Sequence, residues 1–168
     1  DCAIMVIDAA KGVEKQTRKL FEVCKLKKIP VLTFINKMDM PGQDPLDLMH
    51  EVENVLQIQS SAFNWPIGTG REFVGVVDRA TNDYLIFSKT SIGGAQKAEI
   101  SRYTQSEVQG KVDASILEKL TSELELLEIA GNAFSQELFL KGEMTPVFFA
   151  SALTNFGVEP FFDAFIHL

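Results

Sequence analysis

The sequence predicts an α/β fold in which a parallel β-sheet, covered by helices, is interrupted by an inserted α+β subdomain. Apolar runs of strand length occupy residues 2–7, 29–35 and 145–150, and helical patterns follow the first two runs. The third run comes late, because about 115 positions separate Asn36 from Ser151. Continuous apolar runs are typical of parallel strands covered on both faces, so we expect the strand at 2–7 to be buried on each side.

Helices are expected after each of the first two strands and at the end of the chain. Within residues 14–28, an apolar stripe and a lysine-rich end indicate a helix. Asp44 and Pro45 suit the cap and the first position of the next helix, because proline lacks the N–H that this position leaves unpaired. The residues expected to face the core are Leu20, Phe21 and Cys24 in the first helix, Leu46, Met49, Val52, Val55 and Leu56 in the second, and Phe161, Phe162, Phe165 and Ile166 in the last.

The long interval between the second and third strands predicts an insertion. Loops are typically a few residues long, so about 70–80 residues of this interval form a unit of their own. We assign residues 1–60 and 144–168 to the sheet domain and residues 61–143 to the inserted subdomain.

Inside the insertion, two short apolar runs around residues 78–83 predict a β-hairpin. An amphipathic helix is expected over 116–127, with Ser115 in its capping box, and a short helix is expected over 134–139. The polar stretches 57–60 and 88–110 are interpreted as connections between elements. The hairpin residues expected to share one face are Val74, Val76, Tyr84 and Ile86.

The second strand leads directly into Asn36-Lys37-Met38-Asp39. Guanine presents two neighbouring N–H donors, which an acceptor-only carboxylate such as Asp39 matches, whereas adenine would leave that carboxylate unpaired at a cost of about 1–3 kcal/mol. Asn36 can donate to the base or tie two loops together, and the Lys37 stem can lie along the base plane. Ligands bind at the carboxyl ends of parallel strands, so we predict a guanine site here. The alternative is an ordinary polar turn after a buried strand.

The third strand leads into Ser151-Ala152-Leu153, which we expect at the same edge of the sheet. There the Ala152 backbone N–H can donate to the guanine carbonyl oxygen, and Ser151 can brace the Asp39 loop. Taken alone, this segment could equally be a helix-capping turn. The predicted base-binding residues are Asn36, Lys37, Asp39, Ser151, Ala152 and Leu153; no catalytic or metal-binding residue is predicted.

The segments 1–14, 34–39, 64–68 and 145–153 carry a resemblance that covers nearly the whole chain. They resemble the translational GTPases, most closely the bacterial peptide chain release factor 3 family and more loosely elongation factor G and the ribosomal-protection proteins. The resemblance implies the carboxyl-terminal half of a Ras-like P-loop GTPase domain. It further implies a cytoplasmic three-domain factor that uses GTP on the ribosome to remove the stop-codon-reading release factors. An elongation factor G-like or ribosomal-protection GTPase is the alternative.

A phosphate-binding loop of the form Gly-x-x-x-x-Gly-Lys-Ser/Thr is absent from the sequence. Gly70 and Gly75 have the right spacing, but valines follow them. Asp39-Met40-Pro41-Gly42 imitates an Asp-x-Pro-Gly switch, yet Asp39 cannot serve both ends of a nucleotide, and Gln43 stands where the resemblance places a catalytic histidine. We expect the phosphate loop, the switches and the Mg²⁺ ligands upstream of Asp1. The chain alone should bind GTP or GDP with about millimolar affinity or worse and hydrolyse nothing.

The composition argues against several other classes of function. The net charge of −7 gives no broad basic surface for DNA or other nucleic acid. The two cysteines and two histidines lack metal-like spacing, and no apolar stretch reaches the ~20 residues needed to span a bilayer. We expect a cytoplasmic protein without a membrane partner. In a second class of function, the chain is a non-catalytic module whose insertion binds a protein partner and whose Asn-Lys-x-Asp motif is vestigial.

Overall fold

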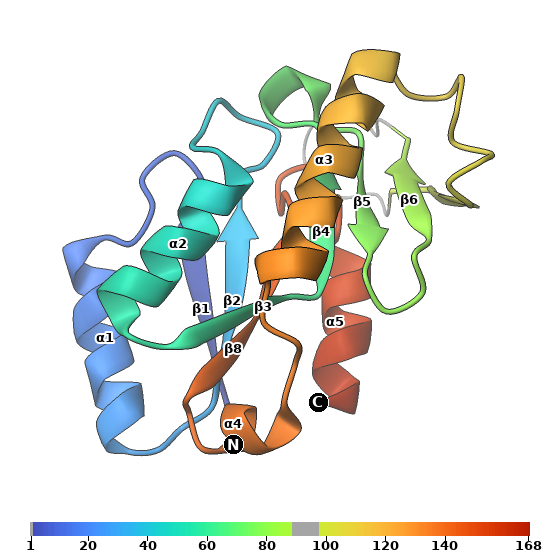
Figure 1. Ribbon diagram of the computed structural model, residues 1–168. Helices are drawn as coiled ribbons and strands as arrows, with labels where there is room; N and C mark the ends of the chain where they lie inside the picture. The colour runs from blue at the N-terminus through green and yellow to red at the C-terminus, as the bar shows by residue number, and fades with distance from the viewer. Residues whose placement is uncertain (1, 89–97) are drawn as a thin grey trace.

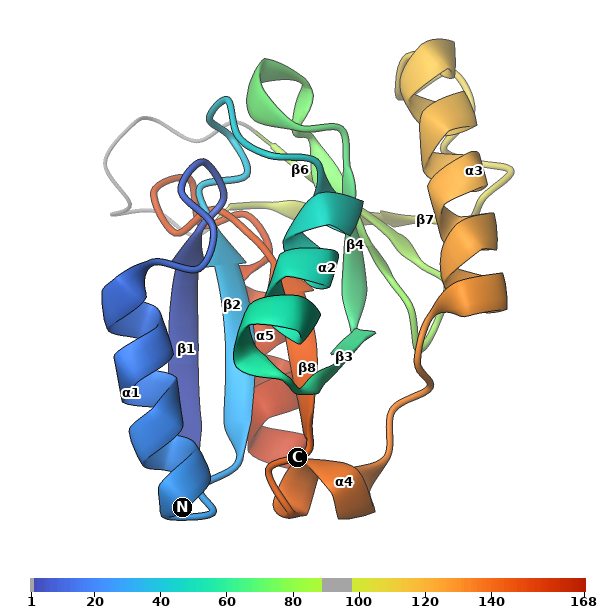
Figure 2. The ribbon, with the colours of Figure 1, turned by 60° about the vertical axis from the view of Figure 1, so that its left-hand side comes forward.

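The computed structural model describes residues 2–88 and 98–168, whose strands form two sheets (Figures 1 and 2). The first sheet is parallel with the strand order β1-β2-β8-β3, and the second is antiparallel with the order β4-β5-β6-β7. The predicted α/β fold with its inserted α+β unit is confirmed.

The parallel sheet and its helices comprise β1 (Ala3–Asp8), α1 (Lys15–Leu26), β2 (Val31–Asn36), α2 (Pro45–Leu56), β3 (Gln59–Ala62), α4 (Gln136–Leu140), β8 (Met144–Phe149) and α5 (Val158–His167). The antiparallel sheet and its helices comprise β4 (Asn64–Ile67), the 3-10 helix η1 (Gly70–Glu72), β5 (Gly75–Asp78), β6 (Tyr84–Phe87), β7 (Ile100–Tyr103) and α3 (Ala114–Ala130).

Helices lie on both faces of the parallel sheet. α1 and α2 cover one face and α5 covers the other, as the two views agree (Figures 1 and 2). On the α5 face, the Phe161 ring meets Phe34 of β2 and Phe148 of β8 edge-on, at centroid distances of 4.9 and 5.1 Å. The strands β2 and β8 are therefore buried on both sides, as their apolar sequences predict.

The prediction that the first strand is buried on both faces is wrong. Met5 and Ile7 of β1 are buried, whereas Ile4 and Val6 are 42% and 55% exposed. β1 is an outer strand of the described sheet, and α5 packs over β2 and β8 without covering it. The apolar run is therefore a strand with only one face covered in this structure.

The predicted inward stripes of the helices are only partly correct. Asp44 caps α2 as predicted, because its Oδ1 accepts from the Leu46 N–H at 3.0 Å and Pro45 occupies the first turn. Leu20 of α1 and Phe162 and Ile166 of α5 are exposed instead of buried. Both helices meet the sheet through a narrower stripe than their sequences suggest, and the stripe of each contains one fully buried side chain, Phe21 in α1 and Phe161 in α5.

The polar stretch after α2 is a strand, contrary to the interpretation as a connection. β3 pairs with β8 in parallel, and its Ser60 and Ser61 are buried. The Ser60 hydroxyl and N–H both donate to Glu53 of α2, at 2.8 and 3.1 Å, which satisfies polar atoms that the strand buries. β3 crosses residue 61, the predicted start of the insertion, and the division of the chain into domains stays a prediction.

The inserted sheet contains the predicted hairpin in a different register. Val76 of β5 lies opposite Leu85 of β6, and Val77 lies opposite Tyr84, so Val76 and Tyr84 are on opposite faces. The five residues between the two strands fix this pairing. Two strands of this sheet, β4 and β7, were not predicted from the sequence. β7 lies within the supposed connection 88–110, of which residues 89–97 lie outside the described part. The cap of α3 is Asp113, which accepts from the Ser115 N–H at 2.8 Å, instead of Ser115 itself.

Asn64 and Trp65 of β4 join the two sheets. Where β3 ends, the buried Asn64 of β4 continues the pairing along β8: its Oδ1 accepts from the Phe149 N–H at 2.7 Å, and its Nδ2 donates to the Phe149 carbonyl at 3.1 Å. The Trp65 ring then packs edge-on against the Phe149 ring at 5.0 Å. The last residue of β8 is thus held by the inserted sheet.

Candidate functional site

Three parallel strands end at one edge of the sheet, and the predicted base-binding residues meet there. Asp8 at the end of β1 lies opposite Asn36 at the end of β2. The Ala150 N–H donates to the Ile35 carbonyl at 2.9 Å, and the Met38 N–H donates to the Ala150 carbonyl at 3.1 Å. The loop after β2 and the segment after β8 are therefore in direct contact at the carboxyl edge of the sheet, which is where open α/β sheets bind ligands.

Asn36 ties these two segments together. Its Oδ1 accepts from the Lys37 N–H at 2.8 Å and, across the edge, from the Ala152 N–H at 2.9 Å. Two roles were predicted for Asn36, and the structure shows the one in which its side chain ties two loops together. The Ala152 N–H, which we predicted to donate to a base, here has the Asn36 oxygen as its partner.

Lys37 reaches a carboxylate that the sequence reasoning missed. Its backbone has a left-handed φ of 69°, and its Nζ lies 2.7 Å from the Asp8 Oδ2. The hydrogen bond from Lys37 lowers the pKa of Asp8 below its ordinary range, and the same bond raises the pKa of Lys37. Asp8 could have been found, because it follows an apolar run in the same way that Asn36 does.

Asp39 carries a sign of a missing partner, which among the described side chains it shares with the Glu51 Oε2. Its Oδ1 is buried, and within residues 2–88 and 98–168 no hydrogen-bond donor reaches it. A buried acceptor without a donor is costly, and such atoms are rare in folded proteins. The neighbouring Met38 is buried and anchors the loop, so the Asp39 carboxylate is held at the edge of the sheet.

The segment after β8 makes a tight turn. Ser151 is fully buried, its N–H and carbonyl pair reciprocally with Phe156, and its Oγ accepts from the Thr154 N–H at 3.4 Å. The bracing of the Asp39 loop that we predicted for Ser151 comes from the Ala150 carbonyl, through Met38. Leu153 is a large apolar side chain that is 57% exposed at this edge.

The chain then turns away from the edge through Met40, Pro41 and Gly42. The Gln43 N–H donates to the Ala9 carbonyl at 2.9 Å, and a Cβ at Gly42 would lie 2.9 Å from that same carbonyl oxygen. A side chain at residue 42 would therefore force the backbone apart. This geometry agrees with the interpretation of residues 40–42 as the turn that leaves the base site.

The described residues contain neither a cluster of metal-ligating side chains nor a helix suited to a membrane. No group of three or more His, Cys, Asp or Glu side chains in residues 2–88 and 98–168 could hold a metal ion. In the same part of the chain, no helix combines the length and the apolar character needed to cross a bilayer.

Comparison with known proteins identifies the class. All of residues 1–168 match the family model described as the elongation factor Tu GTP binding domain, so the chain belongs to this family of GTP-binding domains. Within it, the chain is similar to peptide chain release factor 3 along almost its whole length, which confirms the resemblance derived from the motifs.

Three relatives illustrate the similarity. Peptide chain release factor 3 of Cyanothece sp. (strain PCC 7425 / ATCC 29141) is 47% identical over 167 residues, and that of Nostoc punctiforme is 48% identical over 167 residues. The protein of Ligilactobacillus salivarius is 47% identical over 169 residues. Each alignment covers 99% of this chain and 31%, 31% and 32% of the respective relative. The chain thus spans about a third of the length of these curated relatives.

Proposed function

We propose that this chain is the guanine-recognising part of a translational GTPase of the release factor 3 type. The observation that carries the proposal is the buried, unpartnered Oδ1 of Asp39 at the carboxyl edge of β2, next to the segment 151–153. A neighbouring pair of N–H donors on a flat base would complete this carboxylate.

The other predicted residues have complementary roles in the proposal. The aliphatic stem of Lys37 lies along one side of the base while its ammonium stays with Asp8. The exposed Leu153 offers an apolar surface for the other side. The Ala152 N–H exchanges its bond to Asn36 for one to the guanine carbonyl oxygen, and Ser151 fixes the turn that presents it.

We further propose that the longer protein acts in the cytoplasm and uses GTP to remove stop-codon-reading release factors from the ribosome. The names of the relatives support this class of factor. GTP hydrolysis with Mg²⁺ would require the phosphate loop that this sequence lacks, so the chain alone is proposed to be inactive.

A nuclear magnetic resonance titration with GDP and ADP tests the base site. GDP should shift the amide signals of residues 36–39 and 150–153, with a dissociation constant of about millimolar or weaker, and ADP should not. Asp39→Ala should abolish the GDP shifts, whereas Asp47→Ala, which removes an exposed carboxylate on α2, should leave them unchanged.

A reciprocal variant sharpens this test. Asp39→Asn presents an amide N–H where the carboxylate accepted, so it should lose GDP and gain xanthosine diphosphate, whose base has a carbonyl in place of the guanine amino group. Equal shifts with GDP and ADP in the original chain, or GDP shifts that survive Asp39→Ala, would contradict the proposal.

A further inference from the structure

The loop that follows β2, residues 37–44, is held by the inserted subdomain as well as by the parallel sheet. From the sheet side, the carbonyls of Ala9 and Ala150 accept its backbone N–H groups. From the insertion, the Gly70 N–H donates to the Met38 carbonyl at 2.8 Å. A second contact from the insertion is made by a side chain, because Lys119 of α3 places its Nζ 3.0 Å from the Asp44 Oδ2.

Asp44 connects this contact to the loop geometry. Its Oδ1 caps α2 by accepting from the Leu46 N–H, while its Oδ2 accepts from Lys119. The preceding residue, Gln43, is fixed to Ala9. One carboxylate therefore sets both where α2 begins and where the loop lies relative to the insertion.

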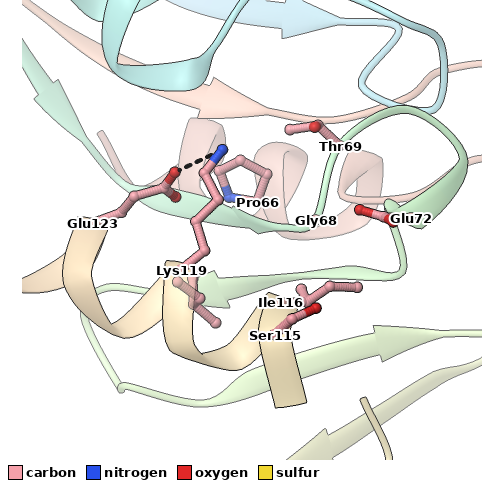
Figure 3. Close-up of a pocket in the computed structure, with 9 residues that line it drawn as sticks. Pro66, Gly68, Thr69, Glu72, Ser115, Ile116, Lys119 and Glu123 are labelled. Atoms are coloured by element: carbon pink, nitrogen blue, oxygen red, sulfur yellow. Dashed lines mark ion pairs between the residues drawn. The ribbon is translucent and has the colours of Figure 1, made fainter. Parts of the chain in front are cut away.

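Lys119 also forms an ion pair within its own helix, with Glu123. Its Nζ lies 3.3 Å from the Glu123 Oε1, one turn along α3, and the Glu123 Oε2 accepts from the Trp65 Nε1–H at 2.7 Å. Figure 3 shows the Lys119 side chain arched toward Glu123 over Pro66, with Thr69 and Glu72 on the other side of the same hollow. Trp65 and Glu123 are buried, so the positions of these two side chains are fixed by the packing around them.

The series Trp65–Glu123–Lys119–Asp44 thus runs without a break from the core of the inserted sheet to the first turn of α2. The hydrogen bond to Asp44 is the main cause that raises the pKa of Lys119 above its ordinary value. We propose that Lys119 is a positioning residue for the loop 37–44, acting through Asp44, so that the inserted subdomain sets the geometry and the guanine affinity of the loop. The affinity part of this statement rests on the proposed function; the geometric part does not.

The Lys119 side chain has two different carboxylate partners. The pair with Asp44 is exposed on the lysine side, and exposed ion pairs contribute little to global stability. Loss of the lysine charge should therefore act on the loop and the first turn of α2 through Asp44, whereas any fall in the midpoint of urea unfolding should come from the buried Glu123, which loses one of its partners.

The test compares two lysines in the 168-residue chain. Lys119→Met keeps the aliphatic stem and removes the charge. Lys141→Met does the same at a lysine of similar exposure, which follows α4 and pairs with Glu137 of that helix. Without nucleotide, Lys119→Met should shift the amide signals of residues 38–46 and speed hydrogen exchange of the Leu46 N–H. Lys141→Met should do neither. With GDP, Lys119→Met should weaken binding about two- to fivefold.

Two more variants separate positioning from a general structural role. Lys119→Arg should restore the loop signals, because it restores the cation beside Asp44. Asp44→Asn keeps an oxygen to cap α2 but loses the charge, so it should reproduce the Lys119→Met changes, and the double variant should add nothing further.

Loop signals that respond to Lys119→Met no more than to Lys141→Met would overturn the proposal. Failure of the unchanged chain to bind GDP would instead contradict the guanine site, while the nucleotide-free signals would still decide the role of Lys119.

Discussion

α5 and α3 each cover one face of a sheet, and they do so with different chemistry. α5 meets the parallel sheet through Phe161, whose neighbours Phe34 and Phe148 are aromatic. α3 meets the antiparallel sheet through buried leucines and also buries the Glu123 carboxylate against the Trp65 indole. An apolar contact depends on shape and area, whereas a buried carboxylate depends on every one of its partners. Aromatic packing is thus prominent on this face of the parallel sheet, whereas the inserted sheet combines packing with a series of polar contacts that ends at the loop 37–44.

The largest effect should come from the apolar side of this comparison. Phe161→Ala should lower the free energy of unfolding by about 3–5 kcal/mol, because it opens a cavity between α5 and the strands β2 and β8. Urea unfolding followed by far-ultraviolet circular dichroism measures this. Phe162→Ala, at an exposed ring on the same helix, should cost about 1 kcal/mol or less. Equal losses in the two variants would show that α5 is not seated through Phe161.

A smaller effect should come from the polar side. Glu123→Leu preserves bulk but leaves the buried Trp65 N–H without an acceptor, and should cost about 1–3 kcal/mol. Glu123→Gln keeps an acceptor and should cost less. Native-state hydrogen exchange should show the loosening in α3 and β4, with β2 and β8 unchanged. Glu125→Gln on the same helix, at an exposed position, is the control; uniform loosening of both sheets would contradict the distinction drawn here.

The smallest effect concerns the ion pair at the edge of the parallel sheet. The folded pKa of Asp8 lies below 3.8 and that of Lys37 lies above 10.5, so their mutual stabilisation is present between these values. It is lost as the pH falls through the folded pKa of Asp8, or rises through that of Lys37. Asp8→Asn should therefore flatten the acid limb of the stability curve. Lys37→Met should flatten it less, because the Ala10 N–H still lowers the pKa of Asp8, and the double variant should match Asp8→Asn; additive changes would mean that the two groups do not act as a pair.

The sequence was most informative where strand and ligand chemistry coincide. The apolar run before Asn36 predicted both a buried strand and a polar edge, because continuous apolar runs are typical of covered parallel strands and ligand sites lie at the carboxyl ends of such strands. The capping of α2 by Asp44 could also be predicted from the sequence, because the interaction joins residues that are close together in the chain.

The errors involve partners that are distant in sequence. Ser60 is buried in a strand because Glu53 and the strand β8 satisfy its polar atoms. The sequence of residues 57–60 does not indicate either partner. Val76 was placed on the wrong face because hairpin register depends on the conformation of the connecting loop. Ile4 and Val6 are exposed because helix placement, not strand composition, decides which strand of a sheet is covered.

The two Ser-Ala pairs illustrate the same limit. Ser61-Ala62 lies within β3, whereas Ser151-Ala152 lies just beyond β8 and contacts Asn36. The sequence correctly placed Ser151 after a strand. Ser61 also belongs to a strand of the parallel sheet, although its surroundings in the sequence are polar.

Trp65 is the one tryptophan of the chain, and it lies where the two sheets join. Its intrinsic fluorescence therefore comes from a single buried indole that touches Phe149 at the end of β8 and donates to Glu123 of α3. An emission-monitored melt would thus record the parting of the inserted sheet from the parallel one, while circular dichroism averages over every helix. The chain contains its own optical probe of whether these two sheets unfold together or in turn.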